Sequence, residues 1–179
     1  MDSTQPYKVG WIIRYNKRFY VIEAWDELIL PAIGYNSSDI AWKVGSSGTC
    51  DAGSSIDYHE VTELNPQTNQ VIVLTGIGVE GRGKFKLSQP STVTRWGTAK
   101  YQAGALTQDE SPRGNEYPIE IHIANEQPPH IRYENDTTTL TVTPLIYPRG
   151  YIYRIGKYEG PTPPPNFTDF TIGGVQSVG

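Results

Sequence analysis

The sequence has one cysteine, Cys50, and only three histidines in 179 residues. A single cysteine cannot form an intramolecular disulfide and cannot build a cysteine-rich zinc site. Basic residues are also outnumbered, because 15 Lys and Arg stand against 19 Asp and Glu, which gives a net charge of -4. A nucleic-acid or anionic-membrane surface normally needs a basic stripe, so we expect neither nucleic acid nor a membrane as a partner.

Long hydrophobic runs and helical repeats are absent as well. Apolar stretches such as residues 71–74 end within a few residues, whereas a membrane-spanning helix takes ~20. The first residues lack the basic and apolar regions of a targeting signal, which predicts synthesis in the cytoplasm. The chain is instead rich in Tyr, Thr, Gly, Ile and Val. This composition predicts a mainly β fold, either a β-sandwich or a barrel-like lobe.

Alternation of apolar residues and turn residues locates the strands. Residues 7–15 and 18–24 predict an opening hairpin around the turn at Asn16-Lys17. Further strands are predicted at 40–44, 58–64, 70–79, 83–87, 92–96, 137–143 and 151–158. The weak helical candidates are 23–30, which Pro31 stops, and 99–106.

Changes in composition divide the chain into four parts. Residues 5–97 predict one β lobe, and the polar stretch 98–116 predicts a loop or linker. Residues 117–158 predict a second β lobe or a sheet extension. Within it, the alternation at 119–123 and at 131–133 predicts a second hairpin. The prolines that follow Gly160 disfavour sheet pairing, so residues 159–179 predict an extended C-terminal arm.

The arm is more apolar than a solvated tail, because it carries Phe167, Phe170, Ile172 and Val175. These four residues are the candidate partner-binding residues, and we expect them to dock on a neighbouring subunit. Packing of the same side chains on the protein's own surface is the alternative.

Three patterns suggest chemistry but have plainer explanations. Residues 76–81 match G-x-G-x-x-G, yet the residues that follow predict a strand rather than the helix that a dinucleotide site needs, so we expect a glycine-rich turn or bulge and no cofactor. Two histidines and two glutamates of the second hairpin, with Arg132 among them, are the best metal candidate: Glu120, His122, His130 and Glu134. Alternating polar residues are typical of a solvated strand face, so we expect no metal site.

No pattern points to catalysis. A G-x-S-x-G elbow is missing, and Cys50 follows a Gly- and Ser-rich loop. We therefore predict no catalytic residue and no enzymatic activity. Two alternatives stay open: a carbohydrate-binding module that uses Trp11, Trp25, Trp42 or Trp96, and a β-fold hydrolase that assembles convergent acids in a deep pocket.

Residues 7–23, YKVGWIIRYNKRFYVIE, resemble the opening hairpin of SH3-like small barrels, including the first domain of translation elongation factor P. This resemblance implies a local barrel-like hairpin and no functional residue.

Short strands, 18 glycines, 14 prolines, long loops and a terminal arm together resemble the accessory structural proteins of tailed-phage virions. The resemblance implies a non-enzymatic structural subunit, such as a capsid decoration, neck, tail or baseplate component. It would be oligomeric within the assembly, would have other virion subunits as partners and would be localised in the virion.

Overall fold

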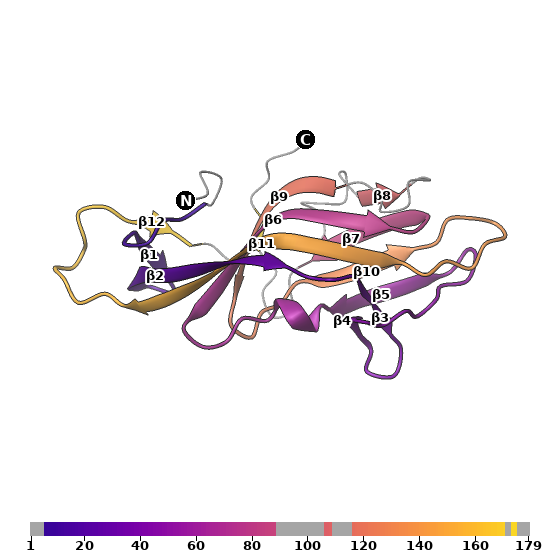
Figure 1. Ribbon diagram of the computed structural model, residues 1–179, viewed down its shortest axis with the longest axis horizontal. Coiled ribbons are helices and arrows are strands. Elements are labelled where there is room, and N and C mark those ends of the chain that lie inside the picture. Colours follow the sequence, from indigo (N-terminus) through magenta and orange to yellow (C-terminus); the bar gives the residue numbers. More distant parts are fainter. Residues whose placement is uncertain (1–5, 89–105, 109–115, 171–172, 175–179) are drawn as a thin grey trace.

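The computed structural model describes residues 6–88, 106–108, 116–170 and 173–174, and the fold is mainly β (Figure 1). The first sheet contains β1 (Ile12–Tyr15), β2 (Arg18–Ile29), β3 (Ile33–Asn36), β4 (Ala41–Val44), β6 (Gln70–Glu80), β9 (Glu116–Ala124), β11 (Leu145–Lys157), β12 (Thr168–Asp169) and β13 (Gly173–Gly174). The second sheet contains β5 (Ser55–Glu60), β7 (Gly83–Ser88), β8 (Leu106–Gln108) and β10 (His130–Glu134). A 3-10 turn at Thr62–Leu64 follows β5.

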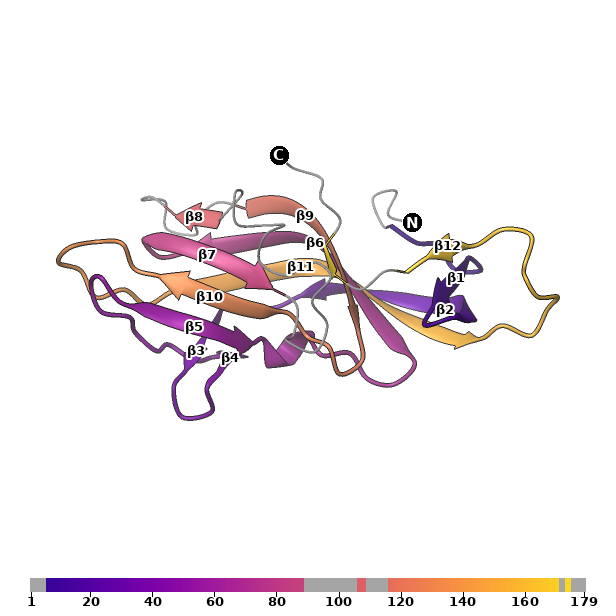
Figure 2. The ribbon, with the colours of Figure 1, turned by 180° about the vertical axis from the view of Figure 1, so that it is seen from behind.

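The two sheets pack face to face, and the second sheet lies in front in Figure 2. Between them is a core to which the first sheet contributes Ile72 and Ile123 and the second contributes Phe85 and Ile131. Face-to-face sheets with such an interdigitated apolar core form a β-sandwich.

The first sheet is apolar on its outer face too. Alternate residues of β6 point to opposite sides, so Ile72 and Leu74 reach the sandwich core while Val71 and Val73 reach the outer face. We call the buried residues of that face the outer cluster: Tyr7, Ile13, Ile22, Val71, Val73, Ala124, Tyr151, Tyr153, Ile155 and Phe170. Two of its members, Tyr7 and Phe170, come from the two ends of the described chain and cover the sheet.

The opening hairpin is confirmed. Asn16 and Lys17 both have positive φ, at 54° and 65°, as a two-residue turn between twisted strands requires. However, β2 continues to Ile29, so the helical candidate at 23–30 is wrong. Residues 24–29 pair with β11, and this tertiary pairing overrides their local helical tendency.

The predicted second hairpin is also wrong, because its two strands lie in different sheets. β9 pairs with β6, whereas β10 pairs with β5 and β7. Between them lie Glu126, with a φ of 67°, and Pro128-Pro129. Proline cannot donate to a ladder, so this linker carries the chain from one sheet to the other.

Several other predicted strands differ in extent. Residues 137–143 contribute only a single bridge, between Val142 and Cys50, and β5 begins before the predicted 58–64 segment and ends at Glu60. The predicted strand 92–96 and residues 99–105 of the second helical candidate lie outside the described residues.

Strands from both halves of the chain share the same sheets. β11 lies between β2 and β6, and β10 lies between β5 and β7. Strands that come before residues 98–116 in the sequence therefore pair with strands that come after them. Within the described part of the chain, no helix has the length and apolar character needed to cross a membrane.

The molecule is elongated because β2 and β11 run beyond the sandwich (Figure 1). At this end β1 pairs with β2 on one side and, in parallel, with β12 on the other. We call this part, with the loops that flank it, the projecting end.

Candidate functional site

The predicted metal candidates are not brought together. Glu120 and His122 lie on β9 in the first sheet, whereas His130 and Glu134 lie on β10 in the second. Nε2 of the buried His122 is 2.8 Å from Oε2 of Glu120. Across the residues described, no group of three His, Cys, Asp or Glu side chains is placed to hold a metal ion.

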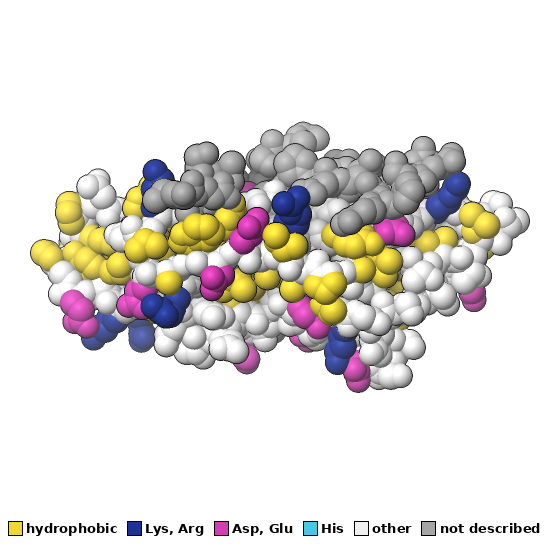
Figure 3. Space-filling view, viewed as in Figure 1, with side chains coloured by type: hydrophobic (Ala, Val, Ile, Leu, Met, Phe, Trp, Pro, Cys, Tyr) yellow, Lys and Arg dark blue, Asp and Glu magenta, His cyan; other side chains and the backbone are white. Residues whose placement is uncertain are grey.

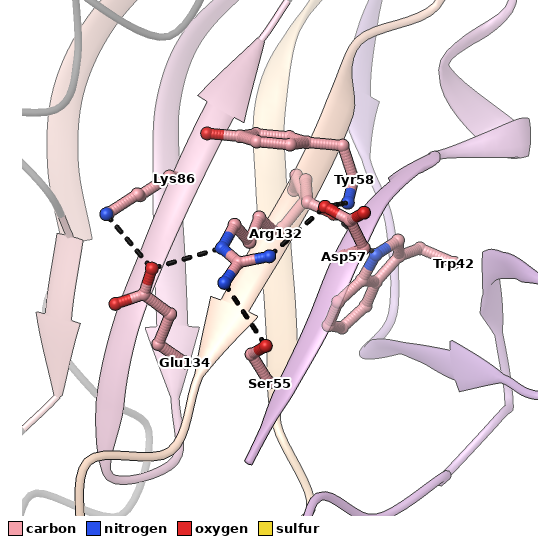
Figure 4. Close-up of polar contacts among 8 residues, drawn as sticks. Trp42, Ser55, Asp57, Tyr58, Lys86, Arg132 and Glu134 are labelled. Atoms are coloured by element: carbon pink, nitrogen blue, oxygen red, sulfur yellow. Dashed lines mark hydrogen bonds and ion pairs between the residues drawn. The ribbon is translucent and has the colours of Figure 1, made fainter. Parts of the chain in front are cut away.

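Arg132 is the centre of a polar network on the outside of the second sheet (Figure 4). Its Nε donates to Oε2 of Glu134 at 3.0 Å, and its other nitrogens donate to Asp57 at 3.1 Å and to Ser55 at 3.2 Å. Nζ of Lys86 donates to the same Glu134 oxygen at 3.0 Å. The network joins β5, β10 and β7, so it is a cross-strand ladder of paired charges.

Hydrogen bonding shapes the electrostatics of this ladder. Lys86, and after it Arg132, lower the pKa of Glu134. The backbone N–H of Tyr58, and then Arg132, lower the pKa of Asp57. Burial lowers the pKa of His130, which lies on β10 with Arg132 and Glu134. The carboxylates are therefore held in their charged form, which suits a stabilising ladder better than proton transfer near neutral pH.

We predict that Glu134→Gln reduces the dependence of stability on pH. Because the folded pKa of Glu134 is below its unfolded value of about 4.3, its contribution is complete above that pH and is lost as the pH falls through the folded pKa. Urea unfolding at pH 6 and pH 3 should show wild type losing more stability than the variant. Glu27→Gln, at an exposed position of β2, is the control and should follow wild type. Equal pH dependence in wild type and Glu134→Gln would contradict the prediction.

The glycine motif is a bulge followed by a turn. β6 shifts register between Leu74 and Gly76 and continues to Glu80. The chain then turns, with positive φ at Gly81 and Gly83, and enters β7 rather than a helix. The predicted turn or bulge is confirmed.

The described part of the arm folds back onto its own chain. Phe170 is 4% exposed, and its ring stacks on His122 with centroids 4.8 Å apart. Its backbone N–H donates to the carbonyl of Arg14 at 2.8 Å. Phe170 therefore packs on the protein's own surface, which was the alternative to docking on a neighbour.

Phe167 remains accessible, at 38% exposed, beside the paired strands of the projecting end. Its ring meets Phe19 edge to face at 5.1 Å, and the Arg14 guanidinium lies 5.0 Å from its centroid. Arg14 also forms a bidentate ion pair with Asp169, at 2.6 and 3.0 Å. Ile172 and Val175 lie outside the described residues.

The candidate sugar-binding tryptophans differ in accessibility. Trp42 is fully buried and donates to the carbonyl of Ile131 at 3.1 Å, and Trp25 is half-buried against Tyr151. Trp11 is 43% exposed. Trp96 lies outside the described residues. Among the tryptophans described, only Trp11 is exposed.

Trp11 and Phe167 line one groove at the projecting end. The groove has a volume of about 490 Å³ and is lined by Gly10, Trp11, Ile12, Pro165, Asn166, Phe167 and Thr168. It lies between β1 and the arm, next to the point where these two segments pair as β1 and β12. Sequence reasoning named both aromatic residues but had no signal that would place them together.

A second accessible feature is the β3–β4 hairpin, which protrudes from the sandwich (Figure 1). Ile40, at the end of its turn, is 56% exposed and has a φ of 53°. Sequence reasoning placed Ile40 in a strand, because a β-branched residue predicts extended backbone. The polar run from Asn36 to Asp39 signals the turn but not the isoleucine's conformation.

Hydrophobic side chains also lie along the face of the first sheet seen in Figure 3. Ile29, on the same side of β2 as Trp25, is 61% exposed.

Comparison of the chain with protein-family models, with curated proteins and with solved structures found no match.

Proposed function

We propose that the protein is a non-enzymatic structural subunit of a larger assembly, such as a phage virion, and that it docks on a neighbouring subunit through the tip of the β3–β4 hairpin. The observation that supports this is Ile40, an exposed isoleucine in left-handed backbone. An isoleucine there disfavours the isolated fold, and docking supplies a reason for its presence.

The backbone of Ile40 is in the region that non-glycine residues rarely adopt. Left-handed backbone costs an ordinary residue roughly 1–2 kcal/mol, and a β-branched side chain there is a clear outlier. Its side chain is largely exposed, so packing within the chain recovers little of that cost. Residues held in sparsely populated backbone conformations cluster at functional sites such as active sites, ligand clamps and switch regions.

The tip is held in one shape by local bonds. Oδ1 of Asn36 accepts hydrogen bonds from the backbone N–H groups of Ser38 and Asp39, at 2.9 and 3.1 Å. Nζ of Lys43 donates to Asp39 at 2.6 Å. A turn fixed in this way presents Ile40 without a large ordering cost on binding.

Ile40 is large enough to anchor a contact. Complete burial of an isoleucine side chain stabilises by about 1.5–3 kcal/mol relative to exposure, and a few such anchors dominate typical interfaces. Phe170 of the arm is buried in the outer cluster and is not available for docking. The hairpin, rather than the arm, is therefore the proposed docking element.

We predict that Ile40→Asn stabilises the isolated protein by about 1 kcal/mol and weakens its assembly. Asparagine tolerates left-handed backbone, so the strain is relieved while the apolar anchor is removed. Stability is measured by urea unfolding. Assembly is measured by native mass spectrometry of the protein and by its incorporation into the purified particle.

Leu140→Asn is the control, since Leu140 is also exposed but lies in a different loop. It should leave incorporation unchanged. Normal assembly of Ile40→Asn would refute the docking proposal, and a loss of stability in the same variant would refute the strain argument.

A further inference from the structure

Within the described part of the chain, the groove at the projecting end has an uncharged lining. None of the seven described lining residues is ionisable, and two of them, Trp11 and Phe167, present exposed aromatic rings. The guanidinium of Arg14, which lies 5.0 Å from the centroid of the Phe167 ring, is paired with the carboxylate of Asp169. The groove therefore offers apolar faces without net charge.

Both rings are held in position although they are exposed. Trp11 meets Tyr7 edge to face, with centroids 6.3 Å apart and ring planes at 69°. Phe167 meets Phe19 at 73° and carries Arg14 over its ring. Tyr7 is itself buried in the outer cluster, so Trp11 is supported from behind. Rings fixed before binding lose little conformational freedom when a ligand stacks on them.

Polar groups stand beside the rings. The Asn166 amide and the Thr168 hydroxyl are exposed at the groove, and neither side chain has a hydrogen-bond partner in the part of the chain described. An amide both donates and accepts, as a hydroxyl does. Aromatic faces with a few neutral hydrogen-bonding groups are what a ligand with apolar faces and hydroxyl edges requires.

We propose that this groove binds a neutral saccharide. The C–H faces of sugar rings would stack on Trp11 and Phe167, and ring hydroxyls would bond to Asn166 and Thr168. The uncharged lining disfavours nucleic acid and anionic glycans, both of which need unpaired cations. The inference does not depend on the docking of Ile40, which lies on the β3–β4 hairpin of the sandwich body.

The test uses the full chain on an array of neutral glycans that includes cellohexaose, maltohexaose and chitohexaose. The glycan bound is then titrated by calorimetry. Trp11→Ala and Phe167→Ala should each weaken its binding about tenfold or more, and Asn166→Ala should weaken it further when combined with either. Ile29→Ala, which removes an exposed apolar side chain elsewhere on the sheet, should leave binding unchanged.

Folding is checked by thermal unfolding, in which the groove variants should melt close to wild type because both rings are substantially exposed. The proposal is overturned if no neutral glycan binds, or if binding survives the double replacement of Trp11 and Phe167. Binding of a proline-rich peptide probe in place of every glycan would also overturn it, since that would identify an aromatic groove for protein. Neither outcome bears on the proposal that the hairpin docks on a neighbouring subunit, which is tested separately by the assembly of Ile40→Asn.

Discussion

Replacing Phe170 with alanine is expected to lower the free energy of unfolding by about 3–5 kcal/mol, the range for large-to-small changes in a packed core. Phe170 is 4% exposed, and its ring contacts His122, Tyr7 and Tyr15, at centroid distances of 4.8, 6.2 and 5.9 Å. These neighbours come from β9, from the N-terminal segment and from β1. Removing one ring would therefore leave a cavity where the N-terminal segment, β1 and β9 meet.

Phe167→Ala is the matched control, because it removes the same side chain three residues earlier from a position that is 38% exposed. We expect it to cost less than about 1.5 kcal/mol, which covers its ring and cation contacts. Both variants are measured by urea unfolding. Truncation after Glu159 removes both rings and should lower stability at least as much as Phe170→Ala. Equal losses from the two single variants would contradict the prediction that burial of Phe170 makes it the larger contributor to stability.

The sequence predicted strands well where local pattern and tertiary pairing agree. The turn at Asn16-Lys17 and the apolar run of β6 both specify their structure through nearby residues. The pattern at 23–30 misled because Ala24, Glu27 and Leu28 favour helix locally. Their pairing with β11, more than a hundred residues later in the chain, is not written in the segment itself.

The alternation at 131–133 correctly indicated one buried and one accessible face in β10, but in β9 His122 is buried as well as Ile121 and Ile123, so the accessible face predicted there is wrong. The alternation did not indicate which partner each strand has, because two dry faces meet equally well within one sheet or across a sandwich. Consequently the cluster proposed around His122 and His130 was divided between the sheets. The β-strand positions were predictable, and the site built from their pairing was not.

The candidate surfaces were less predictable still. Trp11 and Phe167 come from opposite ends of the chain and line one groove only because β12 pairs with β1. Ile40 carries no sequence signal for left-handed backbone, since isoleucine is among the residues that avoid it. The groove and the left-handed backbone of Ile40 can therefore be recognised only in the three-dimensional structure.

Asn135, which follows β10, joins two loops through its side chain. Its side chain is buried, and its Nδ2 donates to the carbonyls of Cys50 and Leu140, at 2.9 and 2.8 Å. Its Oδ1 accepts from the backbone N–H and the hydroxyl of Thr137, at 3.0 and 2.7 Å. One side chain thus joins the loop that follows β10 to the loop around Cys50.

We predict that Asn135→Ala lowers the free energy of unfolding by about 3 kcal/mol. Each lost hydrogen bond costs about 1 kcal/mol net, and leaving the Cys50 carbonyl without this donor in a buried site adds desolvation. Asn125→Ala is the control, because Asn125 makes a single side-chain bond, to the carbonyl of Pro66 at 2.8 Å, and should cost about 1 kcal/mol. The two variants are compared by urea unfolding. If Asn135→Ala costs no more than Asn125→Ala, the four bonds do not act together, and the 135–144 loop is held by the Cys50–Val142 backbone bridge instead.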